Sequence, residues 1–207
     1  MAGRFISLEG GEGAGKSTQL NALAAVLRAQ GLEVVETREP GGSPGAEAIR
    51  RLVLEGGEER WTPEAEALLF AAARADHVAR TIRPALARGA WVLSDRFLDS
   101  SLAYQGAAAG VGTDSVRRLH EIGSGGFLPD RTLLLELPVE DVTQRLSVRD
   151  ADGSDRIGGR GGGFHVRVAA AFSALADAEP DRFRRINAGG NPEDVTARLF
   201  GAIEDLL

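Results

Sequence analysis

A glycine-rich stretch near the start of the chain has the residue types and spacing to hold a polyphosphate. Residues 10–17, GGEGAGKS, fit the pattern G-x-x-x-x-G-K-[ST]. Small residues let successive backbone N–H groups turn toward the same oxygens, and a following helix adds its positive N-terminal end. The spacing predicts a nucleoside triphosphate site in which Lys16 reaches the β- and γ-phosphates and Ser17 supplies a hydroxyl to Mg²⁺.

An acidic and a basic residue end a later apolar segment. In AWVLSDRF (90–97), Asp95 follows five apolar or small residues, and Arg96 comes directly after it. A carboxylate at the end of a buried strand would face the phosphate loop and hold a Mg²⁺-bound water, and a guanidinium fork suits phosphate oxygens. The alternative is an Asp–Arg surface pair at a strand end.

Residues 150–163, DADGSDRIGGRGGG, carry glycines at 153, 158, 159, 161, 162 and 163, with Arg156 and Arg160 between them. Such a segment does not hold one conformation alone, and it suits a lid that closes over phosphates and delivers guanidinium groups. A plain flexible loop is the alternative.

Two further stretches are less specific. Phe70 and Arg74 share one helical face, which on pattern alone favours a core aromatic with a snorkelling charge. DSSLAYQG (99–106) offers hydroxyls and an amide suited to a base edge. The three histidines lie far apart in sequence and have no ligand spacing, so we interpret them as structural or solvent-facing.

Strands and helices are expected to alternate along the chain. Apolar runs bounded by Gly or Pro predict strands at 4–10, 32–37, 90–97, 131–138 and 182–188. Helical periodicity predicts helices at 17–30, 46–55, 63–88, 114–122, 139–149 and 164–178, and from about 192. Residues 38–45 are predicted to form a loop. This order indicates one α/β domain over 1–207, a parallel sheet with helices on both faces and ligands at the carboxyl ends of its strands.

Composition narrows the class of partner and compartment. The 207 residues carry 24 basic and 30 acidic side chains, a net charge of −6, which argues against non-specific binding to nucleic acid or to an anionic membrane. The absence of cysteine excludes disulfides and cysteine-ligated zinc. No signal-peptide pattern or membrane-length apolar run is evident, so we expect a cytoplasmic protein.

Seven stretches occur in the order and spacing typical of bacterial thymidylate kinases: EGGEGAGKSTQ, TREPGG, LLFAAAR, SDRF, SLAYQG, PDRTLLLEL and DRI. The chain resembles this family over essentially its whole length. The resemblance implies a P-loop nucleoside monophosphate kinase fold with a mobile glycine-rich lid over about 150–163. It also implies Mg²⁺-dependent transfer of the γ-phosphate of ATP to thymidine 5′-monophosphate (dTMP), giving dTDP and ADP in dTTP biosynthesis, by a homodimer.

The same resemblance assigns residues to the two substrates. ATP would be bound by the phosphate loop and one lid arginine: Gly10, Gly11, Glu12, Gly13, Ala14, Gly15, Lys16, Ser17, Thr18 and Arg160. The dTMP site would comprise Glu12, Glu39, Pro40, Arg50, Phe70, Arg74, Arg96, Ser100, Tyr104 and Gln105. In that site Phe70 would stack on the thymine ring, Arg74 would donate to a base carbonyl, and Arg50 and Arg96 would hold the acceptor phosphate.

Catalysis is expected from Lys16, Arg96, Glu12 and Arg156, and metal binding from Ser17 and Asp95. Because the phosphate loop contains no arginine, the chain resembles family members that keep the catalytic arginine in the lid. It departs from the family pattern at Gly158, where an acidic residue is typical, and at Phe172, where a tyrosine is common.

Two other functions are compatible with the phosphate loop. One is a nucleotide kinase with a different acceptor, and Arg50 with Arg96 then still favours a monophosphate over a neutral hydroxyl. The other is a P-loop switch or an ATP-dependent binding module. The sequence contains no Asn-Lys-x-Asp motif for guanine and no evident water-orienting glutamine, which favours a kinase.

Overall fold

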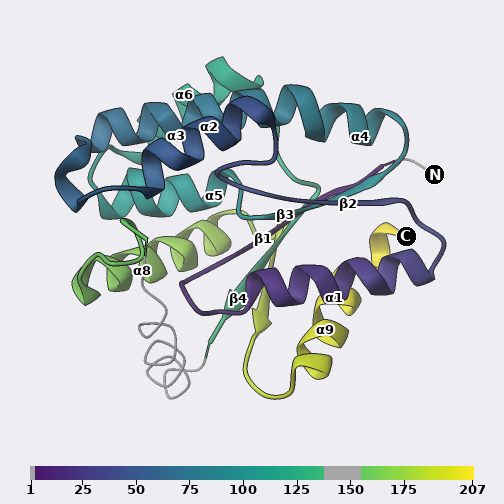
Figure 1. Cartoon of the computed structure of the whole chain (residues 1–207). Coiled ribbons are helices and arrows are strands. Elements are labelled where there is room, and N and C mark those ends of the chain that lie inside the picture. Colours follow the sequence, from purple (N-terminus) through teal and green to yellow (C-terminus); the bar gives the residue numbers. More distant parts are fainter. Residues whose placement is uncertain (1–2, 138–154) are drawn as a thin grey trace.

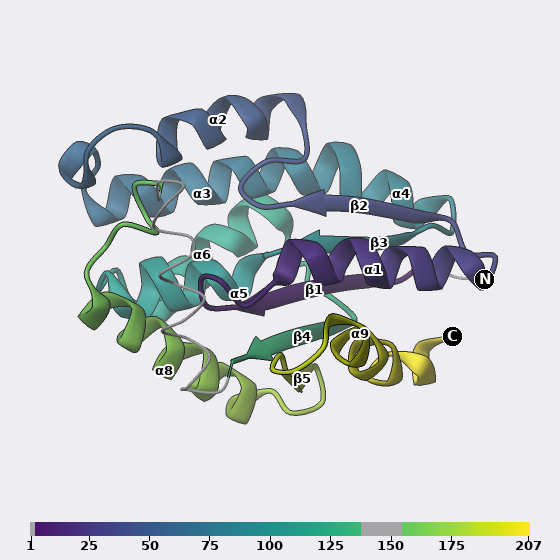
Figure 2. The same ribbon diagram turned by 60° about the horizontal axis from the view of Figure 1, so that its bottom comes forward.

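Five strands form one parallel sheet in the computed structural model, which describes residues 3–137 and 155–207. The strands are β1 (Phe5–Gly10), β2 (Val34–Arg38), β3 (Trp91–Asp95), β4 (Arg131–Glu136) and β5 (Phe183–Asn187). Their order across the sheet is β2-β3-β1-β4-β5, with helices on both faces (Figures 1 and 2). Leu8 of β1 lies opposite Asp95 of β3 and Leu133 of β4, so the carboxyl ends of the central strands meet at one edge. The predicted α/β class is confirmed.

Two helices cover one face of the sheet, α1 (Lys16–Ala29) and α9 (Pro192–Gly201). Successive side chains of a strand point to opposite faces, and Ile6 and Leu8 point to this one. They pack with Leu23 and Leu27 of α1 and Leu199 of α9, all fully buried.

The remaining described helices lie on the other face: α2 (Pro44–Leu54), α3 (Pro63–His77), α4 (Arg83–Ala87), α5 (Leu98–Ser101), α6 (Thr113–Ser124) and α8 (Gly162–Ala178). Their core contains Phe5 of β1, Phe97 and Phe172. The rings of Phe5 and Phe97 meet edge to face, 4.9 Å between centroids. This packing anchors the segment that follows β3, where the site lies.

Side-chain caps fix where α2 and α3 begin. The Ser43 hydroxyl accepts a hydrogen bond from the Ala46 N–H at 3.4 Å, and the Thr62 hydroxyl accepts one from Ala65 at 3.3 Å. A proline follows each cap, at a position where its missing N–H costs nothing. These caps set the ends of helices that carry pocket residues.

The structure differs from the predicted elements in two places. The helix expected over 63–88 is interrupted by a π-helical stretch at Val78–Ile82 before α4. Pro84 explains the break, because it has no N–H to donate and its ring crowds the preceding turn. Residues 98–108, for which no element was predicted, form α5 and a π-helical segment, Leu102–Ala108.

The helix predicted at 139–149 and the first part of the lid, 150–154, lie outside the described residues. The second part of the lid is described: residues 156–159 form a turn, and Gly162 and Gly163 begin α8. Within residues 3–137 and 155–207, no helix is both long and apolar enough to cross a membrane.

Candidate active site

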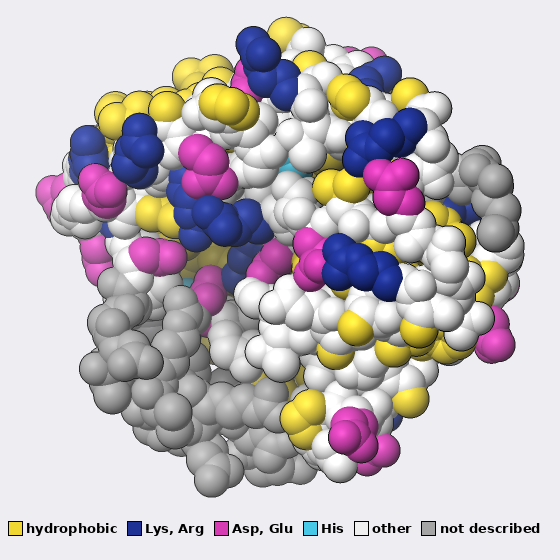
Figure 3. Space-filling model, turned by 45° about the vertical axis from the view of Figure 1, so that its right-hand side comes forward, with side chains coloured by type: hydrophobic (Ala, Val, Ile, Leu, Met, Phe, Trp, Pro, Cys, Tyr) yellow, Lys and Arg dark blue, Asp and Glu magenta, His cyan; other side chains and the backbone are white. Residues whose placement is uncertain are grey.

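A pocket of about 470 Å³ opens at the carboxyl edge of the sheet. Basic and acidic side chains gather around its mouth and apolar surface lies deeper (Figure 3). Of the residues predicted for the two substrates and the metal, the following line it: Glu12, Gly13, Gly15, Lys16, Ser17, Thr18, Glu39, Pro40, Arg50, Phe70, Arg74, Asp95, Arg96, Ser100, Tyr104 and Gln105. The fold therefore brings most of the predicted site residues to one place.

The phosphate loop connects β1 to α1, as its sequence pattern requires. Gly10 has φ +140°, and a Cβ there would lie 2.4 Å from the carbonyl oxygen of Leu135 on the neighbouring strand. Only glycine fits that close approach. Gly15, at φ 83°, directly precedes the first turn of α1, so the helix N-terminus points into the pocket edge.

Lys16 lies in the loop that it completes. Its Nζ donates to the carbonyl oxygens of Gly10 at 3.2 Å and Gly11 at 2.8 Å, and the side chain is buried. Burial and the nearby positive charge of Arg96 lower the pKa of Lys16 to about 8. The ammonium is poorly hydrated there, so an anionic phosphate would stabilise it strongly.

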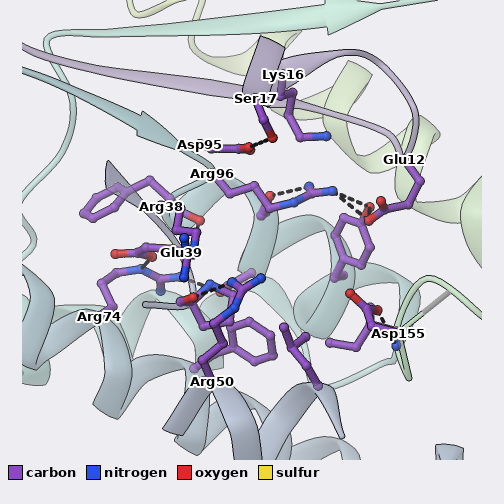
Figure 4. A pocket seen from close by; sticks show the side chains of 18 of the residues that line it. Glu12, Lys16, Ser17, Arg38, Glu39, Arg50, Arg74, Asp95, Arg96 and Asp155 are labelled. Carbon is purple, nitrogen blue, oxygen red and sulfur yellow. Dashed lines mark hydrogen bonds and ion pairs between the residues drawn. The ribbon is translucent and has the colours of Figure 1, made fainter. Parts of the chain in front are cut away.

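Ser17 and Asp95 join the phosphate loop to the end of β3. The Ser17 hydroxyl donates to Asp95 Oδ2 at 2.5 Å, and both side chains line the pocket (Figure 4). Oxygen ligands of this kind are what Mg²⁺ prefers, and in nucleotide sites it takes few protein ligands because phosphates and waters supply the rest. No group of three or more His, Cys, Asp or Glu side chains suited to a metal occurs among the described residues. The Ser17–Asp95 pair fits a phosphate-bound Mg²⁺.

Arg96 extends into the centre of the pocket from a left-handed backbone conformation, φ 71°, which non-glycine residues seldom adopt. Its guanidinium donates to Glu12 Oε1 at 2.8 Å and to Ser100 Oγ at 2.9 Å. It also lies over the ring of Tyr104, 5.1 Å from the centroid. Burial alone disfavours its charge, but interactions with Tyr104 and Glu12 raise the pKa of Arg96 above its ordinary value. The side chain is a fixed cation between the phosphate loop and Tyr104.

Glu9, which the sequence reading did not single out, holds the turn that carries Arg96. Its carboxyl oxygens accept from the Phe97 N–H at 2.7 Å and from Ser100 Oγ at 2.6 Å, and it is fully buried. Burial, followed by the negative charge of Asp99, raises the pKa of Glu9 to about 8. Glu9, the last residue of β1 with a side chain, thus fixes the start of α5.

A buried polar cluster forms the wall opposite the phosphate loop. Arg74 Nε donates to Glu39 Oε2 at 2.7 Å, and the other oxygen of Glu39 lies 2.9 Å from Nδ1 of the fully buried His77. Burial would raise the pKa of Glu39, but the guanidinium of Arg74 and the imidazole of His77 hold it below its ordinary value. Thr37 Oγ1 lies 2.7 Å from the other imidazole nitrogen. A chain of contacts that begins at Thr37 of β2 and passes through His77 and Glu39 thus holds the Arg74 side chain in place.

Arg74 is therefore not the snorkelling charge that its pattern alone suggested. It is 2% exposed, and besides Glu39 it donates to Ser101 Oγ at 2.6 Å. Its third nitrogen, Nη1, makes no hydrogen bond to any described residue, and the side chain lines the pocket. Phe70, one turn earlier on α3, is half-buried and lines the same pocket. An aromatic face and a held guanidinium thus share one wall.

The stretch 99–106 contributes from the other side. Tyr104 donates its hydroxyl to Glu12 Oε1 at 3.3 Å, and its ring packs edge to face on Phe172, 6.3 Å between centroids. The family departure at Phe172 is accommodated in the core behind the pocket. Arg50, from α2, donates to the Pro40 carbonyl oxygen at 2.6 Å, next to the cis peptide bond Glu39–Pro40.

The structure does not bring the two predicted lid arginines to the pocket. Neither Arg156 nor Arg160 lines the pocket; both donate to Glu66 of α3. The Arg156 guanidinium is fully buried and also donates to the carbonyl oxygens of Val53 at 2.8 Å and Glu58 at 3.2 Å. A buried guanidinium needs a carboxylate and several acceptors, and this site supplies them. In this structure Arg156 is an anchor rather than a group facing the phosphates.

Some residues differ between the predicted site and the pocket. Gly10, Gly11 and Ala14 belong to the loop but not to the pocket wall. The following line the pocket but were not predicted: Arg38, Leu54, Phe97, Ser101, Asp155 and Ile157. Arg38 ends β2 and Phe97 follows β3, so their position at strand ends was a usable signal. Asp155 and Ile157 lie there because Arg156 between them is anchored, which the sequence does not reveal.

Comparison with known proteins gives a consistent result. The family model described as thymidylate kinase matches residues 8–199. The thymidylate kinase of Rhizorhabdus wittichii is 65% identical over the full length of both chains, and that of Caulobacter vibrioides is 51% identical over 99% of this chain and 98% of its own. A crystal structure of thymidylate kinase from Ehrlichia chaffeensis superposes with a TM-score of 0.79 at 28% identity, covering all of both chains.

Proposed function

The chain belongs to the thymidylate kinase family and transfers a phosphate from ATP to dTMP, giving dTDP and ADP, and we propose how its residues divide that reaction. The observation that carries the proposal is the shared pocket, in which the phosphate loop faces a wall formed by Phe70 and Arg74. The loop serves the donor and the wall serves the acceptor. Phosphoryl transfer needs the two nucleotides to meet in line between them.

On the donor side, backbone N–H groups of residues 10–18 and the N-terminus of α1 bind the phosphates of ATP. Lys16 exchanges its two carbonyl partners for phosphate oxygens, and its charge neutralises the group in transit. Mg²⁺ would be held by Ser17 and Asp95, directly or through a water, and when bound it supplies charge neutralisation between the β- and γ-phosphates.

On the acceptor side, Phe70 stacks on the thymine ring and Arg74 directs Nη1 at a base carbonyl. Gln105 donates its amide to Glu66 at 2.8 Å, so its oxygen is the part that the pocket wall can offer to a base N–H. Glu39 and Pro40 close the wall from the loop after β2. Thymine carries two carbonyls flanking an N–H, which this pattern of donor and acceptor fits.

Arg96 and Arg50 hold the acceptor phosphate, and Arg96 also faces the transferring group. Two hydrogen bonds support both roles, because the Arg96 guanidinium donates to the Gly10 carbonyl oxygen of the phosphate loop and to the Ser100 hydroxyl. Glu12, paired with Arg96 at 2.8 Å, orients that guanidinium and lies where the acceptor sugar would come closest to the loop. The chemical step needs no general base of unusual strength, since positioning and charge neutralisation dominate phosphoryl transfer.

We also propose that the chain acts as one catalytic domain in the cytoplasm, where its nucleotide substrates are found. We further propose that two copies of the chain assemble as a homodimer. Support for self-association comes from Ile122 of α6 and Leu68 of α3, which are 84% and 55% exposed on helices that pack together. A second copy covering them would remove apolar surface from water. Sedimentation of the wild type and of Ile122→Glu tests this: the variant should be monomeric at concentrations where the wild type is a dimer, and a wild-type monomer would contradict the proposal.

The reaction is tested by measuring ADP release with Mg²⁺-ATP and a panel of monophosphates: dTMP, dUMP, dCMP, dAMP and dGMP. We expect dTMP to have the highest kcat/KM. Higher efficiency with a purine or with dCMP would assign the pocket to another acceptor, which is the second candidate function. Nucleotide hydrolysis at an equal rate without any monophosphate would indicate a P-loop hydrolase or switch instead.

A further inference from the structure

Glu66 is a buried carboxylate that no part of the phosphoryl-transfer reaction uses directly. It lies on α3 one turn before Phe70, is 1% exposed, and is absent from the pocket wall. One oxygen, Oε1, accepts from the Gln105 side-chain amide at 2.8 Å. The other accepts from Arg156 and, at 2.7 Å, from Arg160. A single side chain thus contacts two segments that are about fifty residues apart and that both reach the pocket.

The first consequence concerns the orientation of Gln105. An ionised carboxylate only accepts hydrogen bonds, so the Gln105 group that faces Glu66 must be the NH₂. The Gln105 amide oxygen makes no hydrogen bond to any described residue, and Gln105 lines the pocket. Glu66 therefore determines that the pocket is offered an acceptor rather than a donor at this point of its wall.

The second consequence concerns the segment at Asp155–Ile157. The Arg156 guanidinium is held by Glu66 and by two carbonyl oxygens, and its backbone N–H donates to the Leu54 carbonyl at 3.2 Å. The residues on either side of Arg156 line the pocket. Fixing the arginine therefore fixes a stretch of pocket wall that comes from the far end of the chain.

We propose that Glu66 is a positioning residue for the acceptor nucleotide: its carboxylate orients the Gln105 amide oxygen into the pocket and holds the Asp155–Ile157 wall against α2 and α3. This inference rests on the proposed function, because it takes the pocket beside Phe70 as the dTMP site. Lys16 and Ser17 of the donor loop form hydrogen bonds with neither Gln105 nor Arg156, so we expect Glu66 to act on one substrate and not on the other.

The variant Glu66→Gln makes the orientation argument testable. Its side chain keeps one oxygen and gains an NH₂. The guanidiniums of Arg156 and Arg160 and the amide of Gln105 then compete for the single oxygen of Gln at position 66. The arginines win, because charge-assisted hydrogen bonds are stronger than neutral ones. The new NH₂ then faces Gln105, whose amide must turn its oxygen toward position 66 and its NH₂ toward the pocket. A base N–H would meet a donor where the wild type offers an acceptor.

We expect Glu66→Gln to raise the KM for dTMP about tenfold or more, the scale of one polar group left without its partner, and to leave the KM for ATP within about twofold. A structural defect alone would lower the amount of active enzyme and leave both KM values unchanged. Arg131→Gln is the control, because it breaks an ion pair between a buried arginine and the exposed carboxylate of Asp205, at the start of β4 and at the opposite edge of the sheet. It should lower the melting temperature with no change in either KM.

Glu66→Asp covers the case in which Glu66→Gln does not fold. It keeps the charge that neutralises Arg156 but withdraws the carboxylate from Gln105 by one methylene, so the KM for dTMP should again rise while the KM for ATP stays constant.

Unchanged KM values for dTMP in a folded Glu66 variant, or equal rises for both substrates, would overturn the inference. The wild type is measured in parallel: a wild type that does not phosphorylate dTMP would refute the proposed function, whereas an active wild type with neutral Glu66 variants would refute only the role of Glu66.

Discussion

The two halves of the pocket are built in different ways. The proposed donor half is one continuous stretch, residues 10–18, which offers backbone groups and Lys16 for binding. The acceptor half is made of side chains from β2, α2, α3 and the segment 98–108, and buried ion pairs such as Arg74–Glu39 hold them. A site formed by backbone groups needs only a short sequence motif. A site formed by side chains also needs hydrogen bonds and ion pairs that hold those side chains in position. Changes in the two halves should therefore have separable effects.

The largest effect is expected in the donor half, from Lys16→Ala. Removing the charge that neutralises the transferring phosphoryl group should lower kcat by about a thousandfold or more. The circular dichroism spectrum should be unchanged, because Lys16 bonds only carbonyl groups of its own loop among the described residues. Steady-state ADP release measures the loss, and near-normal turnover of the folded variant would contradict the assignment of the loop.

In the acceptor half, Phe70→Ala should raise the KM for dTMP about ten- to hundredfold, because stacking on an aromatic ring contributes about 1–3 kcal/mol per base. The KM for ATP should stay within about twofold. Phe200→Ala is the control, since Phe200 is a half-buried phenylalanine that packs on the opposite face of the sheet. Equal rises for both nucleotides, or an unchanged KM for dTMP, would show that Phe70 is a core residue only.

A pH profile sharpens the comparison, because only the donor half contains a lysine with a depressed pKa. Lys16 loses its proton near pH 8 in the free enzyme, and its neutral form cannot neutralise phosphate charge. The value of kcat/KM for ATP should therefore fall above about pH 8, by up to about tenfold per pH unit. The value of kcat should fall at a higher pH, since bound phosphates favour the charged lysine. A kcat/KM profile that stays flat to pH 10 would contradict this.

The smallest effects on turnover are expected from the two arginines after residue 154. Arg156→Ala leaves Glu66 buried without its main partner and should lower the free energy of unfolding by about 3–5 kcal/mol, but kcat of the folded fraction by less than about tenfold. Arg160→Ala, at a partly exposed ion pair, should lower the free energy of unfolding by about 1 kcal/mol or less. Urea denaturation and kcat on the same samples measure both. A thousandfold loss of kcat in folded Arg156→Ala would restore the catalytic role that its sequence position predicts.

The donor half depends on a short local motif and the acceptor half on contacts between distant elements. This difference explains which features of the fold and the site could be predicted from the sequence. The parallel sheet, the phosphate loop and the meeting of Asp95 with Ser17 follow from local patterns, because strand ends and a glycine motif determine them. The π-helical segment 102–108 and the burial of Arg74 were not predicted from pattern, since they depend on packing between distant elements. The ion pair of Arg156 was not predicted for the same reason: its partner Glu66 lies ninety residues away in the sequence.

The most direct test of the separation is calorimetric titration of ATP and of dTMP into Lys16→Ala and Phe70→Ala. We expect opposite effects on the two nucleotides. Lys16→Ala should weaken ATP binding and leave the Kd for dTMP within about twofold, whereas Phe70→Ala should leave ATP binding unchanged and raise the Kd for dTMP at least about tenfold. Loss of affinity for both nucleotides in both variants would contradict it, because the two halves of the pocket would then form a single cooperative site.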